Sequence, residues 1–139
     1  MAFNGYLLKL GGASGTVFPM KYIKVEGYDA TPNQRMESEA KRAITGELHR
    51  TTVAHTATKI EFNTPNMTNV DVAEMMRLFR SKWTSVAERK LKLQYYDSET
   101  DSYKTGDFYM PDIKFPIQRI DLENNLIYYG ETRIAFIEY

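Results

Sequence analysis

The chain has 139 residues, and its 18 Lys and Arg side chains balance 18 Asp and Glu side chains, so the formal net charge is zero. No overall field attracts nucleic acid or an anionic membrane, and neither is predicted as a partner. The absence of cysteine excludes disulfides, thiolate nucleophiles and the usual zinc and iron–sulfur ligand sets.

The N-terminal residues predict a short opening hairpin. Residues 6–10 form an apolar run that ends in the glycine-rich stretch 11–15, and residues 21–28 alternate apolar and polar side chains. The glycine-rich stretch lacks the lysine and the following helix that a phosphate-binding loop requires. It is therefore interpreted as a turn.

Residues 29–62 form a polar stretch that has almost no apolar face of its own and carries a turn signal at Thr45-Gly46. This pattern predicts a long projecting hairpin arm over about residues 30–58. Because such a hairpin cannot bury its own side chains, we expect it to gain order by packing on another copy or another protein. The candidate interface residues of the arm are Pro32, Arg35, Met36, Arg42, Leu48, His49, Arg50 and His55.

One amphipathic helix is predicted over about residues 68–83. Thr68 or Asn69 can cap its N-terminus, and Asp71 lies in the favourable first turn. An apolar stripe recurs at helical spacing and consists of Val72, Met75, Met76, Phe79 and Trp83. No polar group converges on this stripe, so it is interpreted as core, and no cofactor is predicted.

The C-terminal half predicts antiparallel strands. Residues 90–95 and 103–109 form a meander hairpin. Ile113, Phe115 and Ile117 then alternate, and because Pro111 and Pro116 cannot donate to a ladder, this segment is predicted to be an edge or bulged strand. Residues 126–129 and 133–137 are expected to form a strand pair or one bent strand. The predicted fold is a single mainly β (α+β) domain over residues 1–139, an antiparallel β-sandwich or barrel with one helix and the arm. Its predicted core contains Leu8, Ile23, Ile60, Phe62, Leu91, Leu93, Phe115 and Ile134.

The residues that could carry chemistry form no convincing site. His49 and His55 share a parity along the arm, but a regular strand separates them by about 20 Å, too far for one metal ion. The acidic turn at 97–101 alternates carboxylates, yet it lacks the central glycine and distal glutamate of an EF-hand. No G-x-S-x-G motif occurs. We predict no catalytic residue and no metal site, and therefore no enzymatic activity; an enzyme would need the acidic turn to bind a metal.

Several blocks of the sequence resemble a family of small uncharacterised proteins encoded in the tail-gene region of bacteriophages and prophages of Gram-positive bacteria. The blocks are GYLLKLGG, KYIKVEGYDATPNQR, GELHR with HTATKIEF, FYMPDIKFPI and TRIAFIEY. The likeness spans nearly the whole chain. It implies a virion tail or baseplate component, made in the cytoplasm of the host bacterium, and it carries over no catalytic residues.

Tail tube proteins share a β-sandwich or barrel, one packed helix and a hairpin or loop that reaches a neighbouring subunit, which is similar to the order predicted here. The resemblance thus implies a homo-oligomer, by analogy a hexameric ring, that also contacts other tail or baseplate proteins. In this hypothesis the β-core is a rigid tile, and Met76 and Phe79 seal one face. The alternative is a tail-assembly adaptor or chaperone that binds another tail protein without forming rings itself.

Overall fold

The computed structural model describes residues 3–42 and 48–139, with the backbone alone at 33, 35–42 and 48–56. Its elements, in chain order, are β1 (Leu8–Leu10), β2 (Thr16–Val17), η1 (Met20–Tyr22), η2 (Val25–Gly27), β3 (Asp29–Arg42), β4 (Leu48–Asn63), β5 (Met67–Thr68), α1 (Asn69–Lys82), β6 (Trp83–Ser85), β7 (Lys90–Asp97), β8 (Ser102–Tyr109), β9 (Ile117–Asp121), β10 (Leu126–Tyr129) and β11 (Arg133–Glu138).

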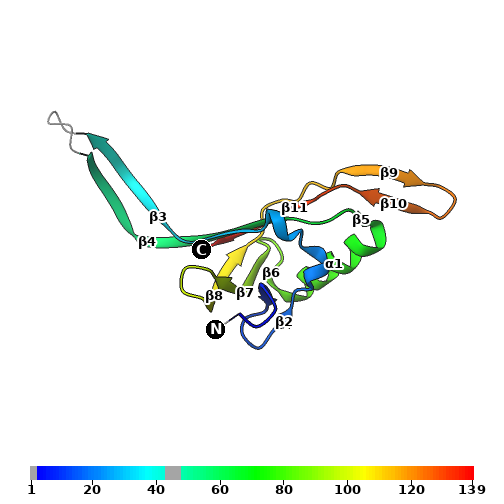
Figure 1. Cartoon of the computed structure of the whole chain (residues 1–139), viewed down its shortest axis with the longest axis horizontal. Coiled ribbons are helices and arrows are strands. Elements are labelled where there is room, and N and C mark those ends of the chain that lie inside the picture. The colour runs from blue at the N-terminus through cyan, green and yellow to red at the C-terminus, as the bar shows by residue number, and fades with distance from the viewer. Residues whose placement is uncertain (1–2, 43–47) are drawn as a thin grey trace.

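The strands form two antiparallel sheets (Figure 1). The larger sheet has the order β2-β1-β7-β8-β11-β4-β3, with β6 also paired to β7, and the smaller has the order β5-β10-β9. The prediction of a mainly β fold with one helix is confirmed. Because β2 and β3 end the larger sheet, the described strands do not close into a barrel, and the arrangement is consistent with the sandwich alternative.

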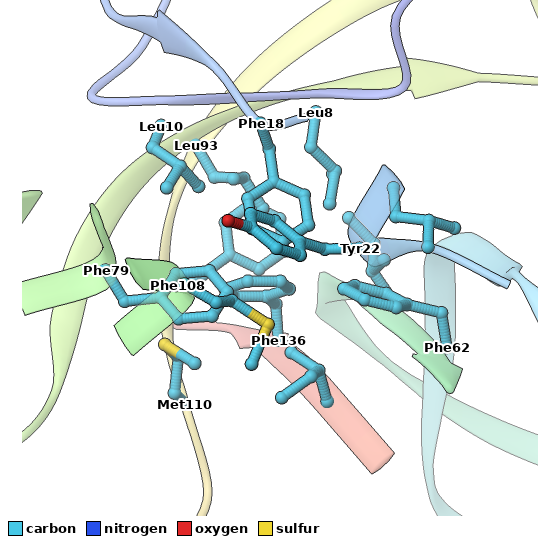
Figure 2. Close-up of a cluster of buried hydrophobic side chains, with 14 of the residues drawn as sticks. Leu8, Leu10, Phe18, Tyr22, Phe62, Phe79, Leu93, Phe108, Met110 and Phe136 are labelled. Carbon is cyan, nitrogen blue, oxygen red and sulfur yellow. The ribbon is translucent and has the colours of Figure 1, made fainter. Parts of the chain in front are cut away.

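The hydrophobic core lies between one face of the larger sheet and the segments that carry η1 and α1 (Figure 2). Phe79 of α1 stacks on Phe18 with ring centroids 5.1 Å apart and meets Phe136 of β11 edge-on at 5.8 Å. Such aromatic contacts add to the free energy gained by burying apolar area. Most of the predicted core residues are buried, namely Leu8, Ile23, Ile60, Phe62, Leu91, Leu93 and Ile134.

The helix begins and ends where its sequence predicts. The Thr68 hydroxyl accepts a hydrogen bond from the Asp71 backbone N–H, and the Asp71 carboxylate accepts one from the Thr68 backbone N–H. This reciprocal capping box satisfies donors that the first turn leaves without partners. Met75 and Phe79 are buried, and Met76 is half-buried against the core. Among the described residues, no helix is long and apolar enough to cross a membrane.

Three local predictions are wrong. Residues 21–28 form the 3₁₀ turns η1 and η2 instead of a strand, and β1 pairs with the short β2. The strand expected at 113–117 begins only at Ile117, after the two prolines, and Phe115 is 37% exposed instead of lying in the core. β10 and β11 belong to different sheets, so they form neither a pair nor one bent strand.

Candidate assembly surfaces

The arm predicted from the sequence is a two-stranded projection in the structure (Figure 1). β3 and β4 pair from Asp29 opposite Glu61 to Arg42 opposite Leu48. β11 supports β4 only from Lys59 to Asn63, so the rest of the arm has no third strand among the described residues. An isolated two-stranded ribbon is marginally stable in water, because half of its backbone groups face solvent and neither face is packed.

The candidate interface residues are distributed along both strands of this arm. Arg35 and Met36 lie in β3, Leu48 begins β4 opposite Arg42, and His49 and Arg50 follow at the distal end. Pro32 lies in a register shift between Thr31 and Gln34. Because proline has no N–H to donate, it is tolerated at such a bulge on an edge strand. The side chains of 35–42 and 48–56 lie outside what the structure describes.

The pairing of the arm is irregular in its middle. Register shifts occur between Arg35 and Glu37 and again between Glu37 and Glu39, opposite the stretch of β4 that contains His55. Bulges bend and twist a ribbon and disturb the alternation of its side chains. The side chains of His49 and His55 lie outside what the structure describes, so their shared parity stays a prediction.

The root of the arm is held firmly by the body. The Thr58 backbone N–H donates to Glu138 at 2.9 Å, and the Thr58 hydroxyl lies 3.2 Å from the Tyr95 hydroxyl. On the other side, Arg133 donates to Glu61, and this hydrogen bond lowers the pKa of the Glu61 carboxyl. These contacts fix the direction in which the arm leaves the body.

A second projection was not predicted. β9 and β10 form a hairpin that leaves the body at the end opposite the arm (Figure 1). Its turn is organised by Asp121, which accepts hydrogen bonds from the backbone N–H groups of Glu123 and Asn124 and from the Asn124 side-chain amide. These bonds, the amide bond first, lower the pKa of Asp121. The signal that could have revealed it is the turn chemistry of residues 121–125 between two short apolar runs.

A shallow groove lies beside the root of the β9–β10 hairpin. Its volume is about 550 Å³, and its lining residues are Lys24, Pro65, Asn66, Gln118, Gly130 and Glu131. Lys24 and Glu131 form an ion pair with each other, so the two charges of the groove are mutually neutralised. The lining residues that the structure describes include no Ser, Thr, Cys or His side chain.

The acidic turn between β7 and β8 serves the fold. Asp97 is buried, forms an ion pair with Lys104 at 2.8 Å, and accepts hydrogen bonds from the Glu99 backbone and the Thr100 hydroxyl. Asp101 accepts a hydrogen bond from the Tyr96 hydroxyl at 2.6 Å. In the part of the chain that the structure describes, no group of three or more His, Asp or Glu side chains could hold a metal ion.

Replacing Asp97 with Asn is expected to lower the free energy of unfolding by about 1–3 kcal/mol at pH 7, because Lys104 loses its buried partner. Burial alone would raise the pKa of Asp97, but the bonds from Lys104, Glu99 and Thr100 hold it below its ordinary value. Its stabilising effect is thus present above the unfolded-state pKa, which is about 4, and is lost as the pH falls through the lowered folded-state pKa.

Urea unfolding of wild type and Asp97→Asn between pH 7 and pH 2 measures this difference, which should shrink at the acidic end. Asp107→Asn removes the same charge from an exposed position on the neighbouring strand and serves as the control. Its effect should stay within about 0.5 kcal/mol. A difference between wild type and Asp97→Asn that does not change with pH would contradict the assigned ion pair.

The chain was compared with protein families, curated proteins and solved structures. The DUF6711 model, which describes a family of unknown function, matches residues 1–139. The chain belongs to this family. No curated protein and no solved structure matches it. Membership in DUF6711 says nothing about the activity, the partners or the source of the protein, so the resemblance to phage tail proteins stays a prediction.

Proposed function

We propose that this DUF6711 member is a structural subunit that assembles with copies of itself, through the arm and the open sheet edges, in the tail or baseplate of a phage or prophage. The observation that carries the proposal is the arm. Its strands, Asp29–Arg42 and Leu48–Asn63, extend well beyond the last support from β11. The phage context rests on the sequence resemblance and is part of the proposal.

The energetics of the arm support assembly. A ribbon of this length orders many backbone residues at about 1–2 kcal/mol each, and beyond Lys59 no third strand among the described residues offsets that cost. Packing on a neighbour supplies the missing burial, and the outer edge of β3 can add a strand from another molecule. Unprotected edges otherwise promote uncontrolled aggregation, which a closed assembly avoids.

The rest of the molecule is suited to be the rigid, repeating body of such an assembly. The core is continuous from β1 to β11 and is sealed by α1. A copy whose arm reaches the next copy makes a heterologous contact, and such contacts close into a ring when the rotation allows. A hexameric ring is proposed by analogy with tail tube proteins.

The test is the mass of the purified protein, measured by light scattering over a concentration series, with electron microscopy of any large species. We expect mass to rise with concentration and the large species to be rings or stacked rings. A monomer or dimer at every concentration would contradict self-assembly and favour the alternative, an adaptor or chaperone that binds another tail protein.

A further inference from the structure

The β9–β10 hairpin carries an exposed apolar surface. Ile117 is 57% exposed, Ile120 is 56% exposed and Leu122 in the turn is 84% exposed; these three residues are called the hairpin surface. Single exposed apolar side chains are common, but a group on a projecting element marks an interaction site.

Strand register places the two isoleucines on one face of the hairpin. Ile117 pairs with Tyr129 and Ile120 pairs with Ile127, and paired residues of antiparallel strands share a face. Tyr129 also pairs with Met67, which is buried in the core. The core-facing side of the smaller sheet therefore continues outward past the body, where nothing in the described chain covers it.

The hairpin surface is too small to form a stable interface alone. Three aliphatic side chains of this exposure offer roughly 300 Å² of apolar area, whereas a standard interface buries about 800 Å² on each partner. The remaining area has to come from backbone and polar contacts along the hairpin. β9 is the end strand of its sheet in the described chain, so its outer edge can pair with an extended element.

The arm of another copy has the required shape. β3 is a 14-residue end strand, and Figure 1 shows the arm and the β9–β10 hairpin extending from opposite ends of the body. Copies arranged head to tail can therefore bring the arm of one against the hairpin of the next. In this arrangement the one arm and the one hairpin of every copy each have a partner.

The charges of the two projections are complementary. Residues 30–58 carry four Lys or Arg against three Glu, a formal charge of +1, and the hairpin residues 117–129 carry one Arg against one Asp and one Glu, a formal charge of −1. Opposite charges favour encounter and disfavour pairing of two hairpins or two arms. The opposite charges of the arm and the hairpin thus favour a contact between an arm and a hairpin over a symmetric contact between two arms or two hairpins.

From these observations we infer that the β9–β10 hairpin is the docking site for the arm of a second copy of this chain. The inference rests on the proposed self-assembly and names its receiving surface. Every copy gives an arm to one neighbour and receives an arm from the other. Ile117, Ile120 and Leu122 are buried in that contact.

The first experiment replaces the hairpin surface with charge. Ile120→Lys combined with Leu122→Lys should raise the concentration for half-assembly by at least about tenfold, because two buried aliphatic side chains are lost. Val86→Lys is the control, because Val86 is 74% exposed in the turn before β7 and lies outside the surface. Circular dichroism and thermal melting check that each variant folds, and Leu122→Lys alone is a milder second variant.

The second experiment mixes two defective copies. A copy that lacks residues 36–50 keeps its hairpin, and the Ile120→Lys, Leu122→Lys copy keeps its arm. At the concentration of wild-type half-assembly, each should be largely monomeric alone, and an equal mixture should form a complex of two subunits and nothing larger, because only one intact contact can form.

The outcomes separate the inference from the proposed function. Assembly of the hairpin variant at the wild-type concentration, together with loss of assembly in the arm deletion, overturns the docking site and leaves self-assembly through the arm intact. The hairpin then has another occupant. A wild-type protein that is monomeric at every concentration overturns both.

Discussion

Deleting Met36–Arg50 is expected to abolish assembly and leave a folded monomeric body. The deletion joins Arg35 to Thr51, and Arg35 pairs with Thr56 in the full chain. Residues 51–55 then form a loop of about five residues, a length that antiparallel strands tolerate. None of the core residues that the structure describes is removed.

Light scattering over the same concentration series measures the loss of assembly, and circular dichroism with thermal melting measures the state of the body. We expect the melting temperature of the shortened chain to match that of the wild type at concentrations where both are monomeric, since mass action links assembly to apparent stability. Unfolding of the shortened chain would show that the arm belongs to the fold, and unchanged assembly would show that the arm is not the contact.

The arm could be predicted because its polarity is a property of the sequence alone. A long polar stretch with a turn signal, placed between apolar strands, has few alternatives to a projecting hairpin or a disordered loop. The root at Asp29 opposite Glu61 agrees with the expected start. The register shifts in its middle could not be predicted, because bulges depend on backbone packing that the sequence pattern does not reveal.

Alternation failed where tertiary packing decides the local structure. In residues 21–28, alternation places Ile23 and Val25 on one face, yet Ile23 is 5% exposed and Val25 is 62% exposed. The 3₁₀ turns η1 and η2 separate the two side chains. The segment buries Tyr22 and Ile23 against the core and returns the chain to the sheet without forming a strand.

The β9–β10 hairpin could not be predicted for a related reason. An apolar residue in a strand-like pattern predicts core, so the sequence places Phe115 in the core and Ile117 at the end of an edge strand. In the structure Phe115 lies in the segment that leads into β9 and is 37% exposed, and Ile117 is the first residue of β9 and is 57% exposed. An apolar side chain that is exposed in one chain and buried in an assembly has the same sequence signal as a core residue.

Phe79→Ala is expected to lower the free energy of unfolding by about 3–5 kcal/mol, a large part of the roughly 5–15 kcal/mol of an ordinary domain. Phe79 is fully buried, and its ring contacts Phe18 and Phe136 at 5.1 and 5.8 Å between centroids. Truncation leaves a cavity where α1 meets the larger sheet, and close-packed neighbours collapse only partly into it.

Phe115→Ala is the matched control, because it removes the same atoms from a residue that is 37% exposed and contacts Tyr129 at 6.2 Å. This substitution should lower the free energy of unfolding by about 1 kcal/mol. Urea unfolding of both variants, at concentrations where the protein is monomeric, compares them directly. Equal losses in the free energy of unfolding would place Phe115 in the core, as its sequence predicts, and would contradict its partly exposed position; a small loss for Phe115→Ala would agree with that position.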